Sequence, residues 1–193
     1  EWPAVLVLLI TCGFFHRGGW RKSAHGGLDL GIPAGAALIR MPWSGWLLLA
    51  DEADPAAAAA HNPRAFNGGA GRYVMVVLPY SDSLLLVLRV LHLKDIPDQL
   101  SGGGERFELV ALEQGALLGV SGGDASNDVG AGFSIGSGHV HLDGRLIARG
   151  PELEGAAAVL TAWRIAEPVD VLPILRASLE RSHRLEFAAG WNQ

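Results

Sequence analysis

The stretch Ser23-Ala24-His25-Gly26-Gly27-Leu28-Asp29 places two good zinc-ligand types four residues apart, separated by a glycine pair that lets the backbone turn tightly. Far downstream, His139-Val140-His141 puts two imidazoles two residues apart, so they share one face of a strand. His92 lies between these segments in an apolar run. A lone histidine is more often a hydrogen-bonded or surface residue than a ligand, but the three segments together indicate a metal site.

Length and composition describe one folded domain with room for a small appendage. The chain has 193 residues, of which 49% are hydrophobic and 18% charged, and its formal net charge is -5. Lysine and arginine form no dense block, so the sequence predicts no nucleic-acid partner. The one cysteine, Cys12, excludes an internal disulfide framework and a multi-cysteine metal site.

The apolar opening from Val5 to Cys12 has three interpretations: the end of a secretory signal, a lipid-anchor site or a buried strand. It lacks a basic region and a starting methionine, it is too short to span a bilayer, and Thr11 fits poorly before a lipidated cysteine. A buried strand is therefore favoured. We expect no signal peptide and no transmembrane segment in this chain.

Short apolar runs separated by glycine and proline predict a mainly β fold, as a compact antiparallel sheet or barrel-sandwich-like core over residues 1–150. Residues 51–71, with five consecutive alanines and several breakers, read as an insertion that forms a helical turn or a loop, and His61 within it as a polar loop residue. Residues 121–138 read as a long loop before His139. The expected strands are 4–15, 36–40, 46–50, 73–78, 84–93, 107–112 and 116–120.

The spacing after Gly150 predicts a C-terminal helical extension, residues 151–193, that packs on the sheet. Helices are expected over 152–167 and 170–184. Pro168 ends the first, Asp170 is the N-cap of the second, and Pro173 is tolerated because it falls in the first turn. We expect His183, near the end of the second helix, to cap the helix or face solvent.

The motifs resemble, in the same order along the chain, those of the lysostaphin-type zinc metallopeptidases, which cut peptide bridges of bacterial peptidoglycan. The resemblance covers roughly residues 9–148. The matching segments are His25-Gly26-Gly27-Leu28-Asp29 for H-x-G-x-D, Pro33-Ala34-Gly35-Ala36-Ala37-Leu38 through Gly45-Trp46-Leu47 for the P-x-G-T-P-V stretch, Val90-Leu91-His92-Leu93 for Y-A-H-L, Leu112-Glu113-Gln114-Gly115 through Gly119 for the V-x-x-G turn, and His139-Val140-His141-Leu142-Asp143 for H-L-H-F-E.

The resemblance implies a role for each of five residues. His25, Asp29 and His141 would bind one Zn²⁺ per chain, and His92 and His139 would be the catalytic pair. Two imidazoles and one carboxylate fill three positions of a tetrahedral zinc and leave the fourth open, as catalytic zinc sites do. Taken singly, these residues also have purely structural explanations. His139 and His141 could be a pleated surface pair, Asp29 a turn-forming aspartate, and His92 a core histidine with a backbone partner.

Departures from the family pattern concern the substrate groove and not the five site positions. Ile135-Gly136-Ser137-Gly138 replaces the usual S-T-G-P before His139, and Arg72 stands where the G-Y-G-N loop has asparagine. These differences bear on which bond would be cut.

The expected function is that of a zinc endopeptidase acting on peptidoglycan peptides, either exported to the cell envelope or carried by a phage virion. The alternative is a catalytically silent wall-binding, regulatory or virion-structural module of the same fold. A carrier-type domain is more distant, since it needs a lysine in a tight hairpin, and Lys94-Asp95 does not match that pattern. The sequence does not indicate an oligomeric state.

Overall fold

Ten β-strands of one antiparallel sheet make up most of the part of the chain that the computed structural model describes. This part comprises residues 9–12, 26–32, 35, 37–51, 72–100, 109–121, 139–151, 153 and 155–177, with the backbone alone for 9–12 and 51. The strands are β1 (Leu9–Cys12), β2 (Leu28–Gly31), β3 (Leu38–Arg40), β4 (Gly45–Asp51), β5 (Arg72–Pro79), β6 (Leu84–Asp95), β7 (Val110–Leu112), β8 (Leu117–Ser121), β9 (Val140–Ala148) and β10 (Pro168–Val169).

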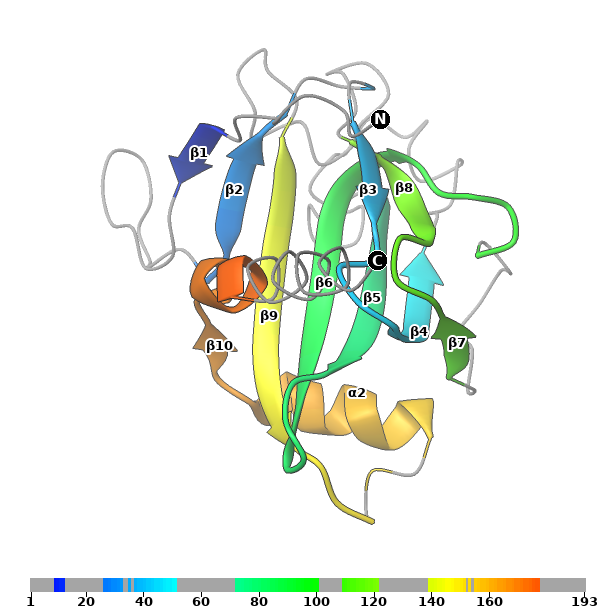
Figure 1. Ribbon diagram of the computed structural model, residues 1–193, viewed down its shortest axis with the longest axis vertical. Helices are drawn as coiled ribbons and strands as arrows, with labels where there is room; N and C mark the ends of the chain where they lie inside the picture. The colour runs from blue at the N-terminus through cyan, green and yellow to red at the C-terminus, as the bar shows by residue number, and fades with distance from the viewer. Residues whose placement is uncertain are drawn as a thin grey trace, which may run out of the picture.

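The strands follow the order β1-β2-β9-β6-β5-β4-β7, as Figure 1 shows, with β10 beside β9 and with β8 pairing both β3 and β6. All of these pairs are antiparallel. The mainly β, antiparallel prediction is confirmed, and the described strands form an open sheet, not a closed barrel. Each strand expected from the sequence overlaps an observed one.

The central strands β6 and β9 are apolar because both faces of the sheet are covered. Leu85, Leu86, Val87 and Leu88 are four consecutive residues of β6, and all are buried. Their side chains alternate between two cores, one on each face. The first core includes Leu28, Leu86, Leu88, Val90, Leu142 and Val171, and the second includes Leu48, Leu85, Val87, Ile147 and Val159.

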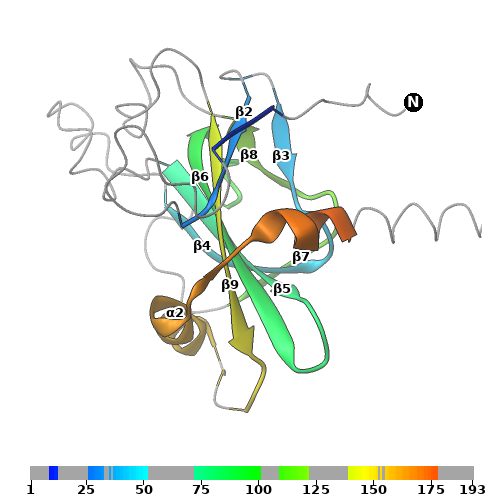
Figure 2. The ribbon, with the colours of Figure 1, turned by 90° about the vertical axis from the view of Figure 1, so that its left-hand side faces the viewer.

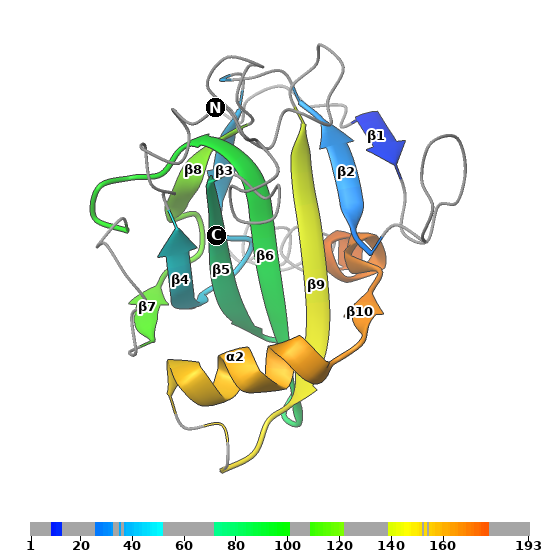
Figure 3. The same cartoon turned by 180° about the vertical axis from the view of Figure 1, so that it is seen from behind.

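The C-terminal segment passes from one face of the sheet to the other around strand β9. Helix α2 (Ala156–Ile165) lies on one face. Strand β10 then pairs with Arg145 and Gly144 of β9 at the point where β2 no longer covers that strand. Residues 171–177 are helical and lie on the opposite face, as Figures 2 and 3 show from two directions. Their first residue, Val171, is almost completely buried in the first core.

The predicted C-terminal helices are confirmed within the described range. The backbone N–H of Leu172 donates to Asp170 Oδ1 at 3.0 Å, which makes Asp170 the expected N-cap. Strand β10 was not predicted, because two residues carry no readable alternation. Residues 52–71, including His61, lie outside the described part, as do the predicted loop up to residue 138 and His183.

No helix in the described ranges has both the length and the apolar character needed to cross a membrane.

The contact between Gly144 and Val171 provides a test of how tightly the C-terminal segment grips β9. A Cβ at residue 144 would overlap Val171 Cγ1 and press on Leu86 Cδ1. We predict that Gly144→Ala lowers the free energy of unfolding by about 1–3 kcal/mol, the usual cost of overpacking a core. Urea denaturation monitored by tryptophan fluorescence measures this.

Gly26→Ala is the matched control, because a Cβ there meets Pro168 Cγ at an ordinary 3.9 Å. An equal loss of stability in both variants would show that the C-terminal segment is not closely packed against β9.

Candidate functional site

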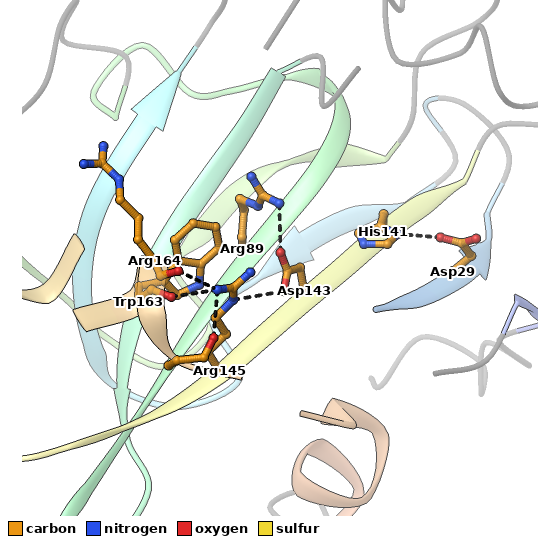
Figure 4. Close-up of polar contacts among 8 residues, drawn as sticks. Asp29, Arg89, His141, Asp143, Arg145, Trp163 and Arg164 are labelled. Carbon is orange, nitrogen blue, oxygen red and sulfur yellow. Dashed lines mark hydrogen bonds and ion pairs between the residues drawn. The ribbon is translucent and has the colours of Figure 1, made fainter. Parts of the chain in front are cut away.

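Asp29 and His141 face each other across two neighbouring strands. They are register partners in the antiparallel pair of β2 and β9, so their side chains emerge on the same face of the sheet. Asp29 Oδ1 lies 2.6 Å from His141 Nδ1, as the dashed line in Figure 4 marks. The Asp29 side chain is 7% exposed and that of His141 17%. A largely desolvated carboxylate and imidazole thus meet at one point.

The neighbours of this pair explain how an aspartate comes to be buried there. Leu28 and Leu30 flank Asp29, alternate with it along β2 and pack into the first core. Val140 and Leu142 do the same on either side of His141. The apolar residues fix which face each strand turns to the core, and this places the polar pair on the other face.

His92 belongs to a β-bulge in strand β6. On the neighbouring strand β5, Tyr73 pairs with Leu91 and the adjacent Arg72 pairs with Leu93, so His92 is an extra residue without a partner in this ladder. Its φ angle is +61°, and it is the one non-glycine residue with positive φ in the described part of the chain. This left-handed conformation is uncommon for a residue with a Cβ.

The bulge turns the His92 ring toward the other two histidines. Leu91 is the register partner of His141, so in a regular strand the next residue would point to the opposite face. Instead, the ring centroid of His92 lies 4.6 Å from that of His139 and 6.1 Å from that of His141. A strained residue at a bulge has therefore brought an imidazole to the face that carries the Asp29–His141 pair.

Burial keeps His92 uncharged. The residue is 8% exposed, and its Nδ1 has no hydrogen-bond partner in the described part of the chain. Desolvation, reinforced by the nearby His139 and His141, lowers its pKa to about 3. A neutral imidazole can donate a hydrogen bond from one nitrogen and accept one at the other.

Gly27 leaves the space that the His141 ring occupies. A Cβ at residue 27 would overlap His141 Nε2 and would lie 2.5 Å from the Leu142 carbonyl oxygen. The glycine pair in the first motif was expected to allow a tight turn, and the structure adds this close approach of backbone to side chain.

The structure thus brings together Asp29, His92, His139 and His141, four of the five residues that the sequence indicated. The fifth, His25, lies outside the described part, directly before Gly26. Within the described ranges, no group of three or more histidine, cysteine, aspartate or glutamate side chains is arranged to hold a metal ion.

Sequence reasoning missed a second polar cluster on the same face, drawn in Figure 4 and formed by Arg89, Asp143, Arg145 and Trp163. One signal for it was present in the sequence. From His139 to Arg145, every second residue is histidine, aspartate or arginine, while Val140, Leu142 and Gly144 lie between them. A polar row of period two on a buried strand indicates a polar stripe on one face.

The left-handed conformation of His92 gives a test by stability. At a φ of +61°, a Cβ costs about 1 kcal/mol that glycine avoids, so we predict that His92→Gly is more stable than His92→Ala by about that amount. The measurement is the free energy of unfolding of both variants in urea. Lys94, an exposed residue of the same strand without positive φ, supplies the control pair.

At Lys94 the order should reverse, with Ala more stable than Gly by about 0.5–1 kcal/mol. If alanine were the more stable substitution at both positions, the left-handed bulge conformation of His92 would be contradicted.

Comparison with known proteins found no matching family model and no matching curated protein. The structure is similar to a mutant catalytic domain of the prophage-encoded M23 protein EnpA from Enterococcus faecalis, with 18% identity and a TM-score of 0.42 over 80% of this chain and 90% of that one. It is also similar to LytU, with 17% identity and a TM-score of 0.47 over 90% and 89%. For Csd3 from Helicobacter pylori the values are 17% and 0.41, over 72% of this chain and only 28% of that one. The solved structures similar to this chain thus include an M23 protein, and M23 is the family of the lysostaphin-type metallopeptidases that the motifs resemble.

Proposed function

We propose that this chain is a zinc-dependent endopeptidase that hydrolyses peptide cross-links of bacterial peptidoglycan. The observation that carries the proposal is the meeting of Asp29 and His141 across β2 and β9, with the His92 and His139 rings gathered on the same face. The order of the motifs along the chain supports the choice of peptidase chemistry. The substrate class follows from the family that these motifs resemble.

The donor types of Asp29 and His141 support the proposal of zinc as the metal. A carboxylate oxygen and an imidazole nitrogen, both zinc donors, point at one another from rigid strands, and Gly27 leaves room for the ring. His92 Nδ1 is a buried polar atom without a partner in the described part of the chain, which is unusual unless a ligand or substrate completes it. Asp29, His141 and His25 would hold the metal.

Bound zinc would supply a Lewis acid that polarises the scissile carbonyl and acidifies water. The chain's own residues would manage the protons. In peptide hydrolysis, a water oxygen bonds to the carbonyl carbon, the carbon–nitrogen bond breaks, and a proton from that water goes to the leaving amine. The His92 and His139 rings lie 4.6 Å apart. His139 would take that proton and pass it on, and the neutral His92 would donate a hydrogen bond to the reacting groups.

Its rigidity suits His92 to stabilise the oxyanion of the tetrahedral intermediate. The bulge and the burial of the residue hold its ring in one place, so little reorganisation is needed when charge develops on the carbonyl oxygen. His139, directly before β9, lies two residues from the proposed ligand His141 and is positioned by the same strand. Because peptidoglycan lies outside the cytoplasmic membrane, we infer that the protein acts as a secreted or cell-envelope protein, or as part of a phage virion.

Two classes of variant separate metal binding from catalysis. We predict that His141→Ala and Asp29→Ala lose both bound zinc and hydrolysis, because each removes a ligand. We predict that His92→Ala and His139→Ala keep about one zinc per chain and lose hydrolysis by about 10²-fold or more, as expected for the loss of an oxyanion donor and of a proton-transfer group, respectively. Elemental analysis measures the zinc, and release of peptides from purified peptidoglycan measures activity.

His61→Ala, which removes a histidine outside all of the motifs, is the matched control and should retain both properties. Full hydrolysis by metal-stripped protein would overturn the mechanism. Absence of zinc from the unaltered chain, even after zinc is supplied at neutral pH, would favour the silent module instead.

A further inference from the structure

The second polar cluster lies directly beside the proposed catalytic site on the same face of the sheet. Arg89 of β6 and Asp143 of β9 are register partners, and the next pair along the same two strands on that face is Leu91 with His141. Residues two apart on a strand are separated by about 7 Å. The Arg89 side chain therefore starts one residue pair away from a proposed zinc ligand.

Arg89 is held firmly but is not saturated with hydrogen bonds. Its Nη2 donates to Asp143 Oδ2 at 2.8 Å, and this is the single hydrogen bond that the Arg89 side chain makes to the described residues. Its guanidinium carbon lies 4.9 Å from the ring centroid of Trp163 and 5.9 Å from that of Tyr73, within the range of cation–π attraction. A guanidinium has five N–H donors, so most of its donor capacity is left over.

Arg145, the other cation of the cluster, is committed elsewhere. Its Nη1 donates to the carbonyl oxygens of Trp163 and Ala166, at 2.8 Å each, at the C-terminal end of α2. These carbonyls carry the negative end of the helix dipole and have no partners within the helix. Arg145 thus links α2 to β9, and the carbonyl groups at the C-terminal end of the helix stabilise its positive charge.

Counting donors and acceptors shows what the cluster lacks. Three buried donors of the cluster lack a hydrogen-bond partner in the described part of the chain: Arg89 Nε, Arg145 Nε and Trp163 Nε1. One buried acceptor of the cluster, Asp143 Oδ1, also lacks one there. Arg145 Nε lies 3.9 Å from Asp143 Oδ1, so a small shift would satisfy both. Donors on Arg89 and Trp163 then remain. The formal charge of Arg89, Asp143 and Arg145 together is +1.

The side chain of Arg89 is 26% exposed, against 8% for Asp143 and 18% for Arg145, so it is the member of the charged trio most open to an incoming group. An arginine that is oriented by a carboxylate and two aromatic rings, and that retains unused donors, is prepared to bind a planar anion. A peptide carries a carboxylate of this kind at its C-terminus and on each acidic side chain.

We propose that Arg89 anchors a carboxylate of the peptide substrate and so makes the site selective for peptides that bear a free carboxylate near the scissile bond. This inference rests on the proposed peptidase function and deepens it. Arg89 acts in it as a specificity residue, in contact with the substrate but not with the reacting atoms. A purely structural role, as a link between β6 and β9, would affect all substrates alike.

The test compares two synthetic cross-linked stem-peptide dimers, one with free carboxylates and one with the same groups as carboxamides. For the zinc-loaded unaltered chain we expect kcat/KM to be about 10- to 100-fold higher for the carboxylate dimer, the range of one charge-assisted hydrogen-bonded contact. Arg89→Gln should lower kcat/KM for the carboxylate dimer by about 10- to 100-fold, so that the ratio between the two dimers falls to about one. Glutamine can still donate to Asp143, which preserves the link to β9.

Two further variants sharpen the comparison. Arg89→Lys should retain part of the preference for the carboxylate dimer, because lysine keeps the positive charge but cannot form a bidentate hydrogen-bonded contact. Arg149→Gln removes an exposed arginine beyond the end of β9 and should leave the preference unchanged. Titration of both dimers into zinc-loaded His139→Ala protein makes the same comparison in binding, without turnover.

The outcomes distinguish the two proposals. Hydrolysis of neither dimer by the unaltered chain contradicts the peptidase function, and the titration then tests the anchor by itself. Equal hydrolysis and equal binding of both dimers, or an equal loss for both in Arg89→Gln, contradicts the carboxylate anchor and leaves the peptidase function standing.

Discussion

The register of strand β9 between β2 and β6 is the constraint on which the candidate site depends. One residue of β9, His141, is the partner of Asp29 on one side and of Leu91 on the other. A slip of one residue in either pairing would turn the imidazole into the core and bring an apolar side chain to the site. The apolar residues that alternate with His141 prevent this slip, because Val140 and Leu142 must stay buried. The hydrophobic core is therefore what aligns the polar residues.

The same strand connects the site to the C-terminal segment. On the face of the sheet that carries His141, Asp143 and Arg145 follow at intervals of two, and Arg145 holds the end of α2. At the edge, β10 continues the pairing that β2 leaves unfinished, and on the opposite face Val171 packs against Gly144. Strand β9 is thus contacted on both faces and along both edges. A rigid strand is a suitable support for groups that must keep their positions during a reaction.

Much of this arrangement could be predicted because it has a pattern. Alternating and continuous apolar runs indicated the strands. The family resemblance of the motifs implied that Asp29, His139 and His141 belong to one site, and the structure places these three residues together. The bulge at His92 could not be predicted, since a single extra residue leaves no trace in apolar periodicity. Without the bulge, the alternation of side chains along β6 would have placed His92 on the face opposite to His141. Only the family resemblance suggested a role for His92 in the site. The partnership of Arg89 with Asp143 also depends on a register that the sequence does not state.

Strand β9 is far in sequence from β2, the strand with which it forms the Asp29–His141 pair, and this affects how the protein folds during synthesis. Asp29 and His141 are 112 positions apart in sequence, and the last strand to join β9 is formed by Pro168 and Val169. During synthesis, a chain that ends before residue 141 has its proposed aspartate ligand but no histidine opposite it. Such late, non-local pairing slows folding. The proposed site therefore cannot assemble on the ribosome before strand β9 has been synthesised.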